Sequence, residues 1–243
     1  MARVLVTGSA DGLGRAAALE LLEDGHEVVV HARSAARAEA LSDLVGRGAA
    51  VVVGDLSDLD GTRAVAEQVA ALEPPDAVIH NAGVYSGAAV LPVNVVAPYL
   101  LTALVDGPTR LVYLSSGMHR GRRADLAGVD WTGRTASHSY SDSKLFVTAL
   151  TLAVARLRPD VRSNAVDPGW VPTRMGGPNA PDDLREGHRT QTWLATSEDP
   201  EARTTGGYWY HRRRDGPEAA AADEAFQDEL LAALERHTGE RLA

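Results

Sequence analysis

The stretch RVLVTGSADGLG, residues 3–14, decides the fold class. An apolar run leads directly into Gly8, Gly12 and Gly14, and an Ala/Leu-rich segment follows. Such glycines let the backbone turn tightly and approach a pyrophosphate, while the start of the next helix offers free N–H groups to it. We therefore interpret the stretch as a dinucleotide-binding loop between a strand and a helix, with a plain tight turn as the alternative.

The same alternation continues along the chain. Apolar runs typical of buried strands occupy residues 3–7, 27–31, 50–53, 77–80, 110–115, 162–166 and 207–210. Segments of helical character lie between and after them, at 12–24, 35–45, 59–72, 93–105, 139–157 and 219–237. This order predicts an α/β protein: one doubly wound Rossmann domain over residues 1–243, with a mostly parallel central sheet of about seven strands. The least regular region, about 168–200, is the predicted substrate loop.

Composition excludes several kinds of function. The 24 Lys and Arg against 33 Asp and Glu give a net charge of −9, which argues against nucleic acid or an anionic membrane as partner. The absence of cysteine excludes disulfides, thiol nucleophiles and cysteine-ligated metals. His119 has no second ligand at metal-binding spacing, so no metal site is expected. With no targeting signal and no apolar stretch of membrane-spanning length, we expect a cytoplasmic protein.

The end of the second predicted strand bears on which dinucleotide binds. No Asp or Glu occurs from position 28 to 38, and Arg33 and Arg37 are nearby. An acidic residue at this edge holds the ribose diol of NAD, whereas an arginine accommodates the 2′-phosphate of NADP. The pattern favours NADP, with NAD as the alternative, since Asp11 adds negative charge to the glycine loop. His31 is either an adenosine contact or a solvated edge residue.

A second motif carries the chemistry. Ser116 follows the predicted strand 110–115, and Tyr140 and Lys144 stand four positions apart at the start of the longest helix. Residues at i and i+4 share a helix face, so the ammonium, together with an oxidised nicotinamide, is expected to lower the phenol pKa from about 10. Tyr140 could then exchange a proton with a carbonyl oxygen that Ser116 positions. Lys144 is the only lysine in the chain.

Taken in order, these motifs resemble the short-chain dehydrogenase/reductase family over almost the whole chain. The residues that carry the resemblance are TGSADGLG (7–14), Gly54-Asp55-Leu56, His80-Asn81-Ala82-Gly83, Val93-Asn94-Val95, Ser115-Ser116, Tyr140 with Lys144, and DPGWVPT (167–173). The segments SSGMH and NAVDPGWVPT resemble the retinol-dehydrogenase-like branch in particular.

The resemblance implies roles for individual residues. The catalytic set would be Asn94, Ser116, Tyr140 and Lys144, with Asn94 holding a water in a proton relay. The implied cofactor-binding set is Gly8, Ser9, Asp11, Gly12, Leu13, Gly14, Arg33, Asp55, Leu56, Asn81, Ala82, Gly83, Tyr140, Lys144, Pro168, Gly169, Val171 and Thr173. Within it, Asp55 would bind the adenine amine and Val171 the carboxamide. Asp55, Asn81 and Asn94 could instead be turn formers or caps.

Three departures from the family pattern stand out, and one of them is His80-Asn81, where the family more often has two Asn. Asn94 follows Asn81 by only 13 positions, which predicts a trimmed segment before the fourth helix. Asp167 stands where this branch usually has His or Asn. An acidic group there could favour the oxidised cofactor, or it could point outward.

The predicted function is interconversion of a carbonyl and an alcohol with NADP(H), on a small and hydrophobic substrate. Trp170, Met175, Trp193, Trp131, Tyr85 and His119 are candidates for the cleft, with core packing preferred for Trp131 and Trp193. The alternatives are an epimerase or dehydratase that uses the same Tyr–Lys pair, and a non-catalytic dinucleotide sensor. The resemblance also implies a homodimer or homotetramer.

Overall fold

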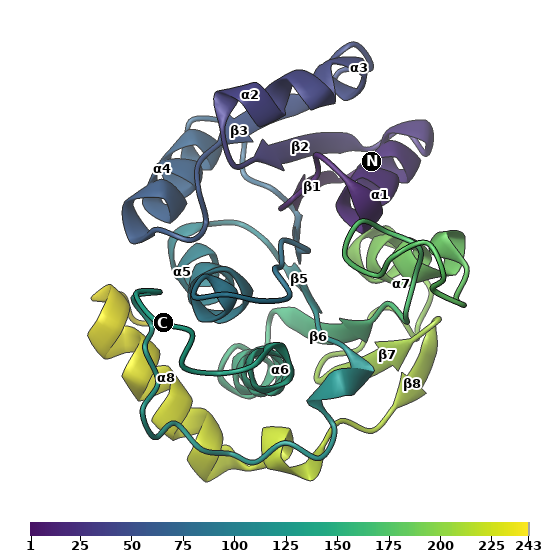
Figure 1. The fold of residues 1–243 in the computed structure, drawn as a ribbon. Helices are drawn as coiled ribbons and strands as arrows, with labels where there is room; N and C mark the ends of the chain where they lie inside the picture. Colours follow the sequence, from purple (N-terminus) through teal and green to yellow (C-terminus); the bar gives the residue numbers. More distant parts are fainter. Residues whose placement is uncertain (243) are drawn as a thin grey trace.

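The predicted strands lie side by side in the centre of the molecule (Figure 1). In this computed structural model, which describes residues 1–242, eight strands form one sheet in the order β3-β2-β1-β4-β5-β6-β7-β8. They are β1 (Arg3–Val6), β2 (Glu27–Ala32), β3 (Ala50–Val53), β4 (Ala77–His80), β5 (Arg110–Leu114), β6 (Arg162–Asp167), β7 (Gly207–Tyr210) and β8 (Arg213–Asp215). Neighbouring strands are parallel except for β7 and β8. The α/β prediction is confirmed, with β8 in addition to the seven expected strands.

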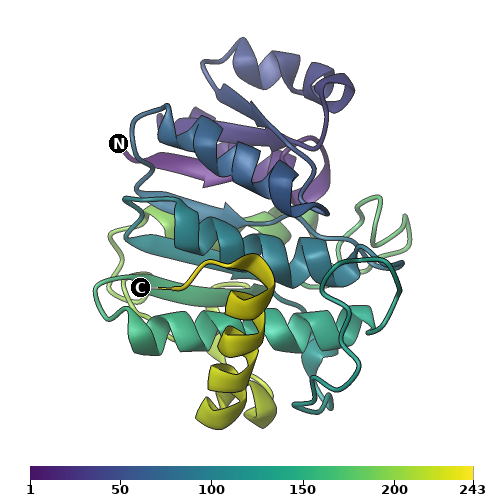
Figure 2. The ribbon, with the colours of Figure 1, turned by 90° about the vertical axis from the view of Figure 1, so that its left-hand side faces the viewer.

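Helices cover both faces of this sheet (Figures 1 and 2). On one face lie α1 (Gly12–Glu23) and α7 (Leu184–Thr196), and on the other lie α4 (Leu59–Ala70), α5 (Ala97–Leu104) and α6 (Tyr140–Leu157). α8 (Glu224–Thr238) crosses α6. Each face has its own buried apolar cluster, one including Val65, Leu150 and Phe226 and the other Leu21 and Leu194. Burial on both faces explains why the strands are almost continuously apolar.

Three predicted helices are less regular than expected. Residues 35–45 form α2 (Ala35–Ala38), a 3₁₀ turn (Glu39–Leu41) and α3 (Ser42–Val45). The segment 93–105 begins as a π-helix (Pro92–Val96) before α5, and a 3₁₀ turn (Ala219–Ala222) precedes α8. Hydrophobic periodicity does not distinguish these windings from an α-helix, because they differ by less than one residue per turn or extend over only a few residues.

Our prediction of an irregular segment over 168–200 was wrong for its second half, which contains α7. Asp183 caps this helix by accepting a hydrogen bond from the N–H of Arg185 at 2.7 Å. The sequence pattern did not predict this helix because it contains Gly187, and glycine disfavours a helix interior. A Cβ at Gly187 would be 2.8 Å from Cγ1 of Val171 and 2.9 Å from Cδ2 of Leu13, so the glycine allows close packing.

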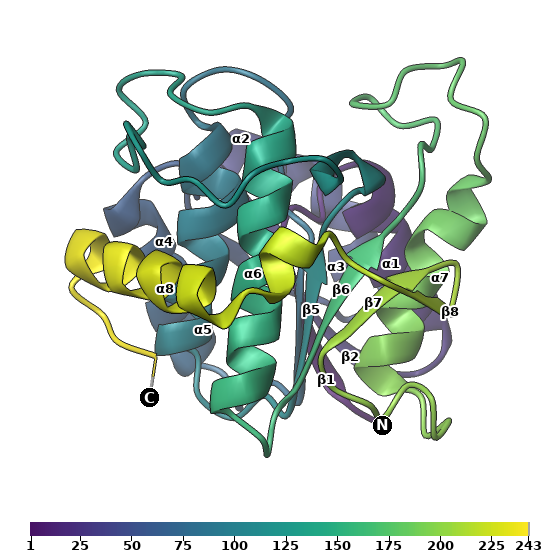
Figure 3. The same cartoon turned by 90° about the horizontal axis from the view of Figure 1, so that it is seen from below.

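The strand order reverses between β1 and β4, which are neighbours in the sheet. Loops that follow the carboxyl ends of parallel strands form a crevice at such a switch point. Segments 120–139 and 168–183 extend from one end of the molecule (Figure 3). Among residues 1–242, no helix combines the length and apolar character needed to cross a membrane.

Candidate active site

The glycine loop joins β1 to α1 and lies tightly against the segment after β4. A Cβ on Gly8 would be 2.9 Å from Cα of Ala82, and one on Gly14 would be 2.3 Å from Nδ2 of Asn81 and 2.5 Å from the carbonyl oxygen of Gly8. Gly8 and Gly12 adopt left-handed φ angles of +68° and +55°. These positions therefore require glycine, and the loop they form at the start of α1 fits a bound pyrophosphate.

Replacing Gly14 by alanine is expected to disrupt this loop. The added Cβ would overlap the Asn81 amide and a backbone oxygen that cannot move independently. We expect a loss of about 2 kcal/mol in the free energy of unfolding and weakened dinucleotide binding. Urea unfolding and fluorescence titration measure the two effects. Gly216→Ala is the matched control, because a Cβ there meets no atom within 4 Å among residues 1–242, and unchanged Gly14→Ala stability would contradict the expectation.

His31 supports the loop from β2, a role that sequence reasoning missed. Its side chain is 2% exposed, so it is neither a solvated edge residue nor an open adenosine contact. The N–H of Gly8 donates to Nδ1 at 3.0 Å, and Nε2, which then carries the proton, donates to the carbonyl oxygen of Gly54 at 2.9 Å. Burial lowers the pKa of His31, in agreement with a neutral ring that bridges the ends of β1 and β3.

The two candidate asparagines hold backbone segments together. Nδ2 of Asn81 donates to the carbonyl oxygen of Thr7 at 2.9 Å, which ties the end of β4 to that of β1. Oδ1 of Asn94 accepts from the N–H of Val84 at 2.9 Å, and its Nδ2 donates to Oγ of Ser143 at 2.9 Å. Asn94 lies in the π-helix, so this winding connects the segment after β4 to α6. Ser143 was not identified from the sequence.

The candidate catalytic side chains meet where the first turn of α6 lies beside the end of β5. Ser139 and Asp142 form a capping box that fixes this turn. The Ser116 hydroxyl lies close enough to the phenol of Tyr140 to affect its pKa, and Nζ of Lys144 lies 5.3 Å from the centre of the Tyr140 ring. The structure thus brings Ser116, Tyr140 and Lys144 together.

The groups of the protein alone raise the pKa of Tyr140, whereas the expected lowering was attributed to Lys144 together with an oxidised nicotinamide. Burial is the largest of the causes that raise it to about 12, and the charge of Asp167 adds to this, while the nearby hydroxyl of Ser116 acts in the opposite direction. Lys144 does not compensate, because its ammonium donates to the carbonyl oxygen of Leu114 at 2.6 Å and burial lowers its own pKa to about 8. Without a cofactor, Tyr140 is therefore a protonated acid.

The outer candidates for cofactor binding differ in their surroundings. Arg33 is exposed at the end of β2. Asp55 is also exposed, and its Oδ1 accepts from the N–H and Oγ of Ser57 at 2.9 and 2.8 Å, which is the geometry of a turn former. Leu56 is 4% exposed and belongs to the apolar cluster beneath α4.

The segment after β6 reaches back to the glycine loop. A Cβ on Gly12 would lie 3.4 Å from Cγ2 of Thr173, so this threonine lies next to the start of α1. Val171 is buried, and Trp170 is 60% exposed although its Nε1 donates to the carbonyl oxygen of Gly176 at 2.8 Å. Pro168 to Thr173 therefore lies alongside the loop that the sequence assigned to the pyrophosphate.

The aromatic candidates for the cleft separate into two groups. Tyr85 packs against Tyr140, with ring centres 4.9 Å apart, and is half exposed. Trp131 packs against Phe146 and Trp193 against Trp209, at 6.1 and 5.2 Å, which is the core packing that we preferred. The remaining candidate, Met175, is exposed in the segment after β6, directly before Gly176.

His119 is not on a cleft rim, which corrects our expectation. It is fully buried, and Nδ1 donates to the carbonyl oxygen of Ser116 at 2.7 Å while Nε2 accepts from the N–H of Glu218 at 2.8 Å. Both ring nitrogens are thus used to hold the segment after β5. Among residues 1–242, no three His, Cys, Asp or Glu side chains form a group that could hold a metal ion.

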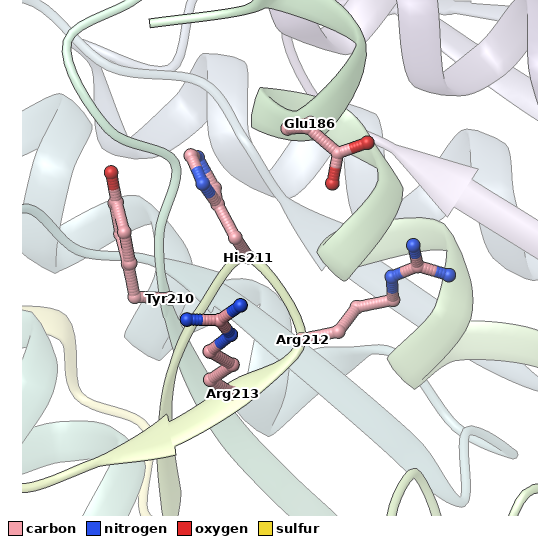
Figure 4. A pocket seen from close by; sticks show the side chains of 5 residues that line it. All are labelled: Glu186, Tyr210, His211, Arg212 and Arg213. Atoms are coloured by element: carbon pink, nitrogen blue, oxygen red, sulfur yellow. The ribbon is translucent and has the colours of Figure 1, made fainter.

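A surface hollow lies at the turn between β7 and β8 (Figure 4). It has a volume of about 520 Å³ and is lined by Glu186, Tyr210, His211, Arg212 and Arg213. The rings of Tyr210 and His211 are stacked with centres 3.9 Å apart. Tyr210 pairs with Asp167 across the sheet, which places the hollow beside the carboxyl end of β6.

Comparisons with known proteins agree with this arrangement. Residues 2–104 match the family model for short chain dehydrogenases. The chain is 40% identical to an uncharacterized oxidoreductase of Emericella nidulans, over 95% of this chain and 94% of that protein. It is 36% identical to the short-chain dehydrogenase chyC of Penicillium rubens, over 100% and 99% of the two chains.

More distant relatives and a solved structure point the same way. Retinol dehydrogenase 14 of Mus musculus is 32% identical over 71% of this chain and 62% of that protein. The crystal structure of an uncharacterized protein from Mycobacterium paratuberculosis superposes with a TM-score of 0.82 at 25% identity, covering 100% of this chain and 95% of that one. The chain is therefore an oxidoreductase of the short-chain dehydrogenase/reductase family, with retinol-dehydrogenase-like relatives.

Proposed function

We propose that this protein is an NADP(H)-dependent oxidoreductase that interconverts a carbonyl and an alcohol on a small, hydrophobic substrate. The observation that carries the proposal is the meeting of Ser116, Tyr140 and Lys144 at the end of the sheet where the glycine loop lies. A bound nicotinamide dinucleotide supplies or accepts the hydride. Solved structures of similar fold support the choice of cofactor, because one is a blue fluorescent protein in complex with NADPH.

In this proposal Tyr140 acts as the proton donor during reduction. Its raised pKa keeps the phenol protonated, which is the form that a carbonyl oxygen requires as it gains negative charge. Ser116 orients the same oxygen, and Lys144 holds the nicotinamide ribose. Asn94 contributes by fixing the segment after β4 against α6.

The remaining proposed cofactor contacts follow the order of the loops around the crevice. The loop from Gly8 to Gly14 would hold the pyrophosphate. Arg33 would bind the 2′-phosphate, and Asp55 would bind the adenine amine through Oδ2, because only its Oδ1 accepts from Ser57. The other contacts would come from Leu56, Asn81, Ala82, Gly83, Pro168, Gly169, Val171 and Thr173.

A panel of aldehydes and ketones, screened with NADPH and with NADH, tests the proposed function. Absorbance loss of the reduced nicotinamide reports turnover, and consumption with at least one hydrophobic carbonyl is the expected result. Direct titration of both dinucleotides accompanies the screen. Absence of binding would refute the proposal, and binding without turnover on a broad panel would favour a dinucleotide sensor.

Replacing Arg33 by aspartate is expected to reverse the cofactor preference. The exposed guanidinium at the end of β2 would be exchanged for a carboxylate, which repels a 2′-phosphate and accepts hydrogen bonds from a ribose diol. We expect the NADPH/NADH ratio of kcat/KM to fall by about 100-fold. Arg47→Asp is the control, because it makes the same charge change at a position that follows α3. An unchanged ratio in Arg33→Asp would show that Arg33 does not bind the 2′-phosphate.

A further inference from the structure

Asp167, the last residue of β6, points into the candidate active site. Its Oδ1 accepts a hydrogen bond from the N–H of Gly169 at 3.0 Å, which fixes the carboxylate. A Cβ built on Gly117 would be only 2.9 Å from Oδ2 of Asp167. Because Gly117 directly follows Ser116, the carboxylate faces the catalytic segment, and the missing side chain of Gly117 makes the space for it.

The charge of this carboxylate reaches the catalytic groups. It adds to the burial that raises the pKa of Tyr140 and of Tyr208 on the neighbouring strand β7, and it opposes the burial that lowers the pKa of Lys144. None of the ion pairs formed within residues 1–242 includes Asp167. Asp167 therefore contributes a negative charge that no salt bridge neutralises to the place where hydride transfer is proposed.

We propose that Asp167 determines which redox form of the dinucleotide binds more tightly, by favouring the oxidised form. This inference rests on the proposed function. The oxidised nicotinamide ring carries a positive charge and the reduced ring does not, so a nearby carboxylate attracts only the first. For two unit charges about 6 Å apart, in a medium with a dielectric constant between those of a protein surface and water, Coulomb's law gives about a fivefold effect on a dissociation constant.

Asp167→Asn tests the proposal by removing the charge while keeping the shape. An asparagine Oδ1 still accepts from the N–H of Gly169, so the loop after β6 retains its hydrogen bond. Isothermal titration of NADP⁺ and fluorescence titration of NADPH give the two dissociation constants. We expect the value for NADP⁺ to rise about fivefold and that for NADPH to stay within about twofold.

Asp160→Asn is the matched control. Asp160 is exposed just before β6, so the same charge is removed at the opposite end of the same strand, roughly 20 Å away. Both dissociation constants of this variant should equal those of the wild type. A fall in NADP⁺ affinity as large as that of Asp167→Asn would show that net charge alone is responsible, which would overturn the inference.

The remaining outcomes separate this inference from the proposed function. If both dinucleotides bind Asp167→Asn with wild-type affinities, the inference is overturned and the proposed function stands. If the wild type binds neither dinucleotide, both are overturned. Should Asp167→Asn lose its native circular dichroism, Asp167→Ser provides a second neutral variant, which must show the same selective loss of NADP⁺ binding for the inference to hold.

Discussion

Replacing Tyr140 by phenylalanine is expected to lower kcat by about a thousandfold while leaving dinucleotide affinity within about twofold of the wild type. The substitution removes the phenol whose pKa is affected by the nearby Ser116 hydroxyl, and with it the proposed proton donor. The ring itself remains and continues to pack against Tyr85. Turnover of a carbonyl identified in the panel screen and titration with NADPH measure the two quantities.

Tyr99→Phe is the control for this prediction. It removes a phenol that donates to the carbonyl oxygen of Glu240 at 2.7 Å, remote from the catalytic groups, so turnover should not change. The pH dependence gives a second check. With a pKa of about 12, Tyr140 is already in the acid form that reduction needs, whereas oxidation needs the phenolate, which becomes more populated as pH rises. Oxidation should therefore accelerate with pH, and full activity of Tyr140→Phe would refute the assignment.

Local patterns in the sequence predicted most of the fold correctly. A buried parallel strand must be apolar over its whole length, and a dinucleotide loop needs glycine at positions such as Gly8 and Gly14, so both leave marks within a few residues. The pattern of helix α7 is less clear in the sequence, because the glycine at position 187 is required by close contacts with Val171 and Leu13 and not by helix propensity. This helix was therefore not predicted, because packing between distant segments placed a glycine within it.

The candidate site was also predicted from the sequence only in part. The spacing of Tyr140 and Lys144 places both on one helix face, and the structure shows them there. The direction of the Tyr140 pKa shift could not be predicted, because it depends on burial by several segments and on Asp167 from another strand. His31 was missed for a related reason, since its partners Gly8 and Gly54 are more than twenty positions away.

The chain has a single lysine, and its replacement is expected to have the second large effect on turnover and stability. Every other basic residue of the chain is arginine, yet Lys144 is expected not to tolerate that exchange. Its side chain is 4% exposed, with Nζ 2.6 Å from the carbonyl oxygen of Leu114 and 3.8 Å from the position of a Cβ on Gly83. A guanidinium is bulkier than an ammonium and stays charged even when buried. Lys144→Arg should therefore lower kcat at least about 100-fold and destabilise the fold by roughly 3 kcal/mol.

Lys144→Met separates the two consequences. It should lose turnover to a similar extent but keep or increase stability, because no charge remains to be buried. The folded-state pKa of about 8 lies below the ordinary value of 10.5, so the unfolded chain binds more protons between these two pH values. Wild-type stability should thus rise relative to Lys144→Met, by up to about 3 kcal/mol, as pH increases from 8 to 10.5. Urea unfolding across this range measures the difference. Parallel stability curves, or Lys144→Arg with nearly wild-type turnover, would show that the ammonium is neither desolvated nor specifically required.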